Sequence, residues 1–151
     1  MWPLADRRAD WHHPAGLGPG NEMYETTPKM LLAGRILSGL AVLLLLTDSA
    51  MTFACPPVLQ EEMKSTGFDI SAHWTIGLIS LVSTLLYALP RTATLGAILL
   101  TGFLGGAICT HVRVDGLGSP PEIVSLVLGL LVWSGLYLRD ARLRAILPLR
   151  S

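Results

Sequence analysis

The sequence predicts an all-α protein, an integral membrane bundle of four helices with both termini on the cytoplasmic side. Two observations predict this class. Only 15% of the 151 residues are charged and the mean hydropathy is +0.53, whereas about 25% charged residues is usual in soluble domains. The chain also contains four apolar stretches of roughly the 17–25 residues that a membrane helix needs. A soluble bundle is the alternative, but its helices would carry a polar stripe, and the interiors of these stretches have almost no charge.

Residues 1–29 precede the first apolar stretch and differ from it in composition. They are rich in Pro, Gly and charge and have no apolar period, which is typical of a disordered tail. The apolar stretch follows too late for a signal peptide. Met23 and Met30 are alternative starting residues, in which case this tail would not belong to the protein.

The four membrane helices are expected within one domain, residues 30–140, followed by a basic cytoplasmic tail, residues 141–151. Because the lipid interior offers no hydrogen-bond partners, each apolar stretch must satisfy its own backbone and therefore forms a helix. The fourth stretch is at the short end of the range. The approximate helix ranges are 31–54, 72–89, 92–112 and 122–138.

Two connections have readable turn chemistry. The link ALPRTA is short enough to make the second and third helices antiparallel neighbours; Pro90 ends one, and Thr92 is expected to cap the next. The longer loop after the first helix contains a candidate amphipathic helix, residues 58–66, ended by Gly67. Its apolar side chains are expected to face the membrane, namely Val58, Leu59 and Met63.

The distribution of Lys and Arg predicts the orientation. Nine of the eleven lie on the side of the two termini, counting Arg35, which can snorkel there from the first turns of its helix. Only Lys64 and Arg113 lie on the other side. Since basic residues of short loops stay in the cytoplasm, the loops 55–71 and 113–121 are expected to face outward.

Glycines concentrate in the third predicted helix, in the run TGFLGGAICTHVR. Gly102 and Gly106 form a GxxxG pair, and Gly105 is spaced four residues from Thr101. Small residues at this spacing let helix backbones approach closely in lipid. The contact is expected within the chain or, alternatively, between copies of a homo-oligomer.

Several polar residues are expected to converge at the outer end of the bundle. A charged carboxylate inside a membrane costs roughly 2.5–3.5 kcal/mol on insertion scales, so Asp48 should face the bundle and either be protonated or have a partner such as His111 or Arg113. Two interpretations remain open: a proton relay or polar substrate site, and a structural pair that pins two helices together. The predicted pocket residues are Asp48, His73, His111, Arg113 and Glu122.

Other kinds of site are less well supported by the sequence. Cys55 and Cys109 are a candidate thiol pair at the outer, oxidising side. No metal site is predicted, because no short ligand spacing is present. Net charge is zero, so nucleic acid is not an expected partner. The chain shows no Gly-rich dinucleotide loop, no haem or iron–sulfur ligands and no Ser-His-Asp arrangement, and we do not expect it to be an enzyme on its own.

The runs GRILSGLAVLLLLTDSAMTF, LLYALPRTATLGAILLTGFLGGAICTHVRVDG and LVWSGLYLRDARLRAILPLR resemble the DoxX-like membrane proteins, from about residue 34 to residue 150. The resemblance implies a multi-pass protein with four helices in a bacterial cytoplasmic membrane. The family is named for a subunit of a thiosulfate:quinone oxidoreductase. Other relatives look like partners of redox or thiol-stress systems, and some eukaryotic ones resemble assembly chaperones.

The resemblance also assigns positions. Asp48 matches an acidic residue late in the first helix, His111 and Arg113 match a THVRV segment, and Arg139 with Asp140 match an inner RD pair. Two positions depart from the pattern. Thr52 stands where relatives often have a lysine, and Ser80 where they often have a glutamate, so Asp48 is expected to pair with Arg113 instead.

The function expected from these observations is that of a non-catalytic subunit or accessory of a quinone-linked membrane redox system. The bilayer and a membrane oxidoreductase are the expected partners. No cofactor is predicted, and the candidate ligands of the pocket are a quinone head group or another small molecule. The alternative is a scaffold or assembly chaperone that acts through helix–helix contacts. A small transporter is a third hypothesis, although no inverted repeat supports it.

Overall fold

A computed structural model describes residues 27–146, and these residues form six α-helices. The expected disordered tail lies almost entirely outside the described residues, as does the end of the expected basic tail. The helices are α1 (Pro28–Ala54), α2 (Pro57–Thr66), α3 (Ala72–Ala88), α4 (Ala93–Asp115), α5 (Pro120–Arg139) and α6 (Ala141–Ile146). The prediction of an all-α fold is confirmed.

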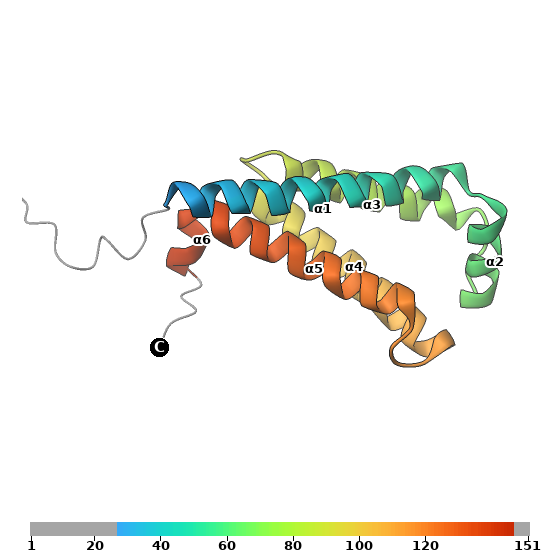
Figure 1. The fold of residues 1–151 in the computed structure, drawn as a ribbon. Helices are drawn as coiled ribbons and strands as arrows, with labels where there is room; N and C mark the ends of the chain where they lie inside the picture. The colour runs from blue at the N-terminus through green and yellow to red at the C-terminus, as the bar shows by residue number, and fades with distance from the viewer. Residues whose placement is uncertain (1–26, 147–151) are drawn as a thin grey trace, which may run out of the picture.

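The four long helices form a ring. α1 packs against α3 and α5, and α4 packs against the same two helices. The chain therefore enters through α1, crosses to α3, returns through α4 and closes the ring with α5. We call the end where α1 begins and α6 lies the inner end, and the end where α2 lies the outer end (Figure 1).

Three of these helices, α1, α4 and α5, are long and apolar enough to cross a membrane. Large apolar side chains are exposed around the ring, for example Leu43 (63%) on α1 and Leu130 (64%) on α5. α3 is apolar but shorter, with 17 residues, or about 26 Å at 1.5 Å per residue. The chain is a multi-pass membrane protein by these criteria. Membrane crossing by α3 and the cytoplasmic placement of both termini stay predictions.

Helix ends differ from the predicted ranges for local reasons. α1 starts three residues earlier than expected because Thr27 accepts a hydrogen bond from the Met30 amide (3.4 Å) and Pro28 occupies the first turn. Thr92 precedes α4 as predicted, but its hydroxyl donates to the Leu86 carbonyl (2.8 Å) and does not cap the helix. After α5, residues 141–146 form α6, where only a tail was expected.

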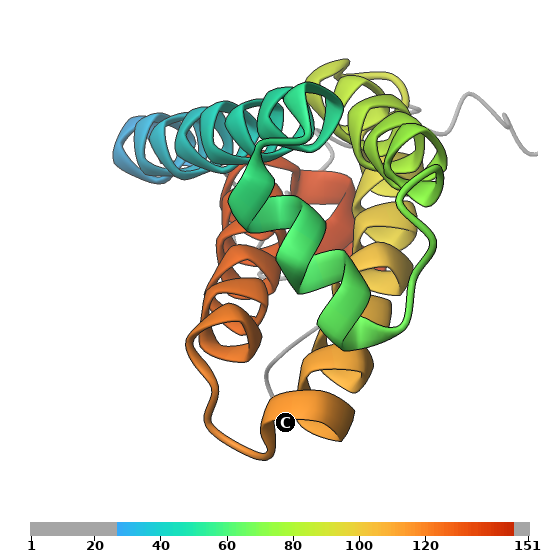
Figure 2. The same cartoon turned by 90° about the vertical axis from the view of Figure 1, so that its right-hand side faces the viewer.

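The predicted helix in the outer loop is present as α2. Gly67 ends it in the left-handed region (φ +83°), and the amides of Gly67 and Phe68 bond back to the Lys64 and Met63 carbonyls. Its apolar side chains do not all face outward as expected, because Leu59 and Met63 turn into the bundle, whereas Val58 is 76% exposed. α2 lies across the outer end of the ring (Figure 2), and Met63 is buried beneath it.

The helices approach most closely toward the inner end, and glycines make this approach possible. A Cβ atom on Gly96 would overlap the backbone of Tyr87, and one on Gly34 would lie 2.7 Å from the backbone nitrogen of Arg139. One on Gly135 would lie 2.6 Å from the Ser38 hydroxyl oxygen. Only a hydrogen at these positions leaves room for the neighbouring helix.

Tyr87 sits at the centre of the inner end, fully buried. Its hydroxyl donates to the Val132 carbonyl (2.9 Å) and accepts from the Ser38 hydroxyl (2.9 Å). Arg139 donates to the Tyr87 carbonyl (3.1 Å), and its guanidinium carbon lies 5.0 Å from the centre of the Tyr87 ring. One side chain of α3 therefore joins α1 and α5.

Toward the outer end the helices separate. In Figure 1 the pair α1 and α3 diverges from the pair α4 and α5, so the ring is closed at the inner end and wide at the outer end. α2 bridges the wide end, where it contacts α4. Residues of both helix pairs line a cavity at this outer end.

Charge also separates along the bundle. Among the described residues, the outer end carries most of the carboxylates and the inner end most of the basic groups. The inner end holds Lys29, Arg35, Arg91, Arg139, Arg142 and Arg144 with Asp140; the outer end holds Asp48, Glu61, Glu62, Asp69, Asp115 and Glu122 with Lys64 and Arg113. This pattern matches the orientation that the positive-inside rule favours.

Cysteine labelling tests the orientation. In a chain that carries Cys55→Ser and Cys109→Ser, we expect an impermeant maleimide to label Lys64→Cys in sealed cells but not Arg142→Cys. Both positions are exposed, so the membrane alone should decide which one reacts. Permeabilised cells provide the control, because both variants should then react. Labelling of Arg142→Cys alone in sealed cells would reverse the orientation.

Candidate functional site

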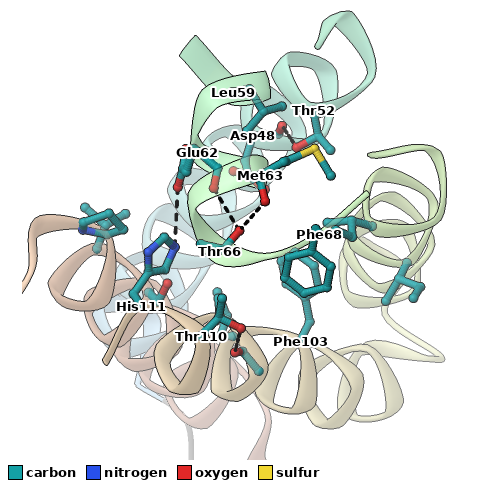
Figure 3. A pocket seen from close by; sticks show the side chains of 18 of the residues that line it. Asp48, Thr52, Leu59, Glu62, Met63, Thr66, Phe68, Phe103, Thr110 and His111 are labelled. Atoms are coloured by element: carbon teal, nitrogen blue, oxygen red, sulfur yellow. Dashed lines mark hydrogen bonds and ion pairs between the residues drawn. The ribbon is translucent and has the colours of Figure 1, made fainter. Parts of the chain in front are cut away.

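A cavity of about 580 Å³ fills the space between the two helix pairs at the outer end, beneath α2. Figure 3 shows it from close by. α1, α2, α3, α4 and α5 all contribute side chains. The apolar wall includes Leu59, Ile76, Ile79, Phe103, Leu104, Val124 and Leu128; the polar side chains are Asp48, Thr52, Glu62, Thr66, Thr110, His111 and Ser125.

The predicted residue Asp48 lines this cavity from α1. Its carboxylate accepts a hydrogen bond from the Ser80 hydroxyl of α3 (3.5 Å). Ser80 also lies 2.9 Å from the Ser49 hydroxyl, so hydroxyl groups extend from Asp48 into the buried contact between α1 and α3. No basic side chain in residues 27–146 forms an ion pair with Asp48. The expected pairing with Arg113 is therefore wrong, and a serine takes the place of the cation.

His111 also lines the cavity, as predicted, and connects α4 to α2. Its Nε2 lies 3.5 Å from the Glu62 carboxylate of α2, and its Nδ1 lies 3.3 Å from the Asp115 carboxylate on its own helix. The His111 side chain is 12% exposed. Figure 3 shows His111 and Glu62 reaching toward one another across the cavity edge.

Sequence reasoning did not identify Glu62 as a site residue. Its spacing was the one feature of the sequence that could have identified it: Glu62 is four residues from both Val58 and Thr66 and therefore lies on the same face of α2 as these residues. α2 was expected to lie against the membrane, which would leave Glu62 in water. Because α2 instead crosses the outer end of the bundle, Glu62 and Asp48 line the same cavity.

The other three predicted pocket residues do not line the cavity. Arg113 donates to the Thr66 carbonyl at the end of α2 (3.1 Å). His73 bonds to the Ile70 carbonyl (2.6 Å), and Glu122 accepts from the Gly118 amide (2.7 Å). These side chains hold loop and helix ends, and Arg113 also fastens α2 to α4.

The two cysteines are free thiols and do not form the candidate pair. Cys55 ends α1 in the left-handed region (φ 44°), and its amide bonds back to the Met51 carbonyl. Cys109 is exposed on α4. Within residues 27–146, no group of three or more His, Cys, Asp or Glu side chains could hold a metal ion.

Gly102, Gly105 and Gly106 of α4 do not make the expected contact within the chain. A Cβ atom on Gly102, Gly105 or Gly106 would meet nothing within 4 Å. The reason is the separation of the helix pairs, which leaves Gly102 and Gly106 facing the cavity. Contact between Gly105 and a second protein or a second copy stays a prediction.

Several polar groups of the cavity already donate their hydrogen atoms within the protein and are left as hydrogen-bond acceptors. Three hydroxyls donate to carbonyls of their own helices, each at 2.9 Å: Thr52 to Asp48, Thr66 to Glu62 and Thr110 to Gly106. A hydroxyl whose hydrogen is engaged still has lone pairs to offer. Together with the carboxylates of Asp48 and Glu62, these oxygens make the cavity rich in hydrogen-bond acceptors.

Comparison with known proteins gives one result. The model of a family described as the DoxX-like family matches residues 36–135, which include all of the membrane-length helices except the start of α1 and the end of α5. Asp48, Glu62 and His111 all lie within the matched range. No curated protein and no solved structure gives a match to the chain.

Proposed function

Since the chain belongs to the DoxX-like family, we propose that it is a non-catalytic subunit of a quinone-linked redox system in the membrane and that its outer cavity binds the quinol head group. The cavity carries this proposal. Its volume of about 580 Å³ lies within the ~300–1,000 Å³ usual for small-molecule sites. Its apolar wall and few polar groups suit an aromatic ring that bears oxygen substituents.

The hydrogen-bond polarity favours the reduced form of such a ligand. A quinone ring offers only carbonyl acceptors, whereas a quinol offers two hydroxyl donors. The cavity presents the carboxylates of Asp48 and Glu62 and the engaged hydroxyls of three threonines. Donors on the ligand meet acceptors on the protein, so the quinol should bind more tightly than the quinone.

Oxidation of the quinol would take place in a partner oxidoreductase, whose redox centre would accept the two electrons while the two protons are released there. Asp48, Glu62 and His111 line the cavity and would hold the quinol hydroxyls by hydrogen bonds before that step. The apolar residues Ile79 (50% exposed) and Val124 (57% exposed) line the cavity. An isoprenoid tail would leave the site past such side chains.

One observation favours the second candidate function, an assembly chaperone or scaffold. Gly105 has open space at its Cβ position and does not line the cavity. Thr101, one turn before it, is exposed. A membrane helix of a client protein could approach this surface closely. Loss of a co-purifying partner on Gly105→Leu, with ligand binding unchanged, would favour this function over the first.

Ligand binding to the purified chain in phosphatidylcholine nanodiscs tests the first proposal. Tryptophan fluorescence would follow titration with decylubiquinol and decylubiquinone under anaerobic conditions. We expect the quinol to bind, and Gly106→Leu to weaken binding by at least about tenfold, or ~1.4 kcal/mol. The leucine would enter the cavity without displacing any atom near its Cβ. Asp48→Asn should weaken quinol binding by a similar factor because it replaces one of the two carboxyl oxygens of Asp48 with an amide NH₂ group, which donates hydrogen bonds and cannot accept them.

Gly105→Leu is the matched control, because it adds the same side chain on the same helix outside the cavity. It should leave quinol binding within about twofold of the unmodified chain. Equal binding by the Gly106→Leu and unmodified chains would show that the ligand does not occupy this cavity.

A further inference from the structure

A second, smaller cavity of about 210 Å³ lies at the inner end of the bundle. It is bordered by α1, the turn before α4 and the end of α5, at the end where α6 lies (Figure 1). Arg35 of α1 and Arg139 of α5 both line it, together with Leu31, Leu136 and Asp140. We call it the basic notch.

Arg35 is the first reason to look for a ligand here. It stands within the apolar helix α1, one turn after Leu31 and on the same helix face. It is exposed, and no hydrogen bond or ion pair joins it to another residue in the described part of the chain. A guanidinium near the membrane interior is costly unless it reaches the interface or a partner.

Arg139 is the second reason, because its position is fixed in advance. The hydrogen bond to the Tyr87 carbonyl (3.1 Å) and the stacking over the Tyr87 ring hold its guanidinium in place. A guanidinium has five N–H donors, so this single bond leaves others for a ligand. Held rigidly, these donors lose little side-chain entropy on binding.

The negative charge of Asp140 would repel an anion in the notch, but the other charges of the site outweigh it. One of its carboxylate oxygens accepts a hydrogen bond from the Arg142 amide at the start of α6 (2.9 Å). The carboxylate therefore serves the helix end, while the two arginines in the notch outnumber it. Lys29, Arg91 and Arg142 add positive charge at the same end of the bundle.

We propose that the basic notch binds a phosphate group, either the head group of an anionic phospholipid in the inner leaflet or free phosphate. Arginine binds phosphate oxygens through paired N–H donors. Basic clusters beside membrane helices attract anionic lipids. The apolar side chains of Leu31 and Leu136 suit the glycerol backbone of a lipid. This site is independent of the quinol cavity, which lies at the other end of the bundle.

Thermal unfolding of the purified chain in neutral detergent tests the proposal. Phosphatidylglycerol, phosphatidylcholine and inorganic phosphate would be titrated separately, since a ligand that binds only the folded state raises the unfolding midpoint. We expect phosphatidylglycerol to raise the midpoint and phosphatidylcholine to leave it unchanged. Arg35→Gln should weaken the phosphatidylglycerol effect by about tenfold in concentration, which corresponds to ~1.4 kcal/mol. Arg35 has no hydrogen bond or ion pair to lose within residues 27–146, so this variant should fold.

Arg91→Gln is the control, because it removes an exposed inner-end charge that does not line the notch. It should keep the phosphatidylglycerol response. Stabilisation by inorganic phosphate with the same dependence on Arg35 would also support the site and would identify free phosphate as a ligand. An equal loss in both variants, or no response to either phosphatidylglycerol or phosphate, would overturn the proposal.

Discussion

Replacement of Gly96 by alanine should strongly destabilise the native bundle. The added Cβ would overlap the backbone of Leu86 and Tyr87 on the neighbouring helix. Backbone atoms cannot rotate away, so α3 and α4 would have to move apart, and the short turn between them limits how far they can move. Overpacking typically costs 1–3 kcal/mol, and we expect ~3 kcal/mol or more here. Size-exclusion chromatography of the extracted protein and its thermal midpoint would measure the loss.

Gly102→Ala is the control on the same helix. A Cβ at Gly102 meets nothing within 4 Å, and alanine favours a helix over glycine by about 1 kcal/mol in soluble hosts. We expect this variant to be at least as stable as the unmodified chain. Equal destabilisation by the two alanines would mean that any added side chain on α4 destabilises the bundle. The loss at Gly96 could then not be attributed to its close approach to α3.

Tyr87→Leu should be the second most damaging change. It removes a fully buried ring, the hydroxyl between Ser38 and Val132, and the surface on which the Arg139 guanidinium rests. Truncation of a buried aromatic residue to alanine costs about 3–5 kcal/mol, so we expect ~3 kcal/mol for leucine. The thermal midpoint in detergent should fall accordingly.

Tyr87→Phe separates the hydroxyl from the ring. It should cost only ~1 kcal/mol, the usual net value of a hydrogen bond. Tyr137→Phe is the matched control, since the Tyr137 hydroxyl has no hydrogen bond within residues 27–146. If Tyr87→Leu and Tyr137→Phe lowered the midpoint equally, Tyr87 would not be the connection between α1, α3 and α5 that the structure indicates.

The elements of the fold follow from local chemistry, and they could be predicted for that reason. Apolar length alone indicates α1, α4 and α5, and Gly67 indicates the end of α2 because a left-handed residue favours glycine. The tight turn before α4 predicts that α3 and α4 are antiparallel neighbours, and they are in contact.

The glycine contacts could not be predicted from the GxxxG pattern. Gly102 and Gly106 have this pattern but face a cavity, whereas Gly34, Gly96 and Gly135 belong to no GxxxG pair and make the close approaches. Spacing identifies a helix face that a neighbour could approach. Whether a neighbour is there depends on how the helices diverge along their length, and that is a property of the whole ring.

The candidate site could be predicted only in part from the sequence. Asp48 and His111 were identified because ionisable groups in an apolar helix need a reason to be there. Glu62 was missed because the direction of α2 depends on contacts distant in sequence, such as the bond from Arg113 to the Thr66 carbonyl. The partner of Asp48 was also missed. The hydroxyl of Ser80 donates a hydrogen bond to the Asp48 carboxyl group, and an uncharged serine cannot be recognised from the sequence as the partner of an acidic residue.

The divergence of the helix pairs has a consequence for the surrounding bilayer. A protein that is narrow at one end and broad at the other takes up more area in one leaflet than in its opposite leaflet (Figure 1). Lateral pressure in the leaflet at the broad end therefore acts to squeeze α1 and α3 toward α4 and α5. The free energy of the open shape then depends on lipid packing and membrane tension as well as on the residues between the helices.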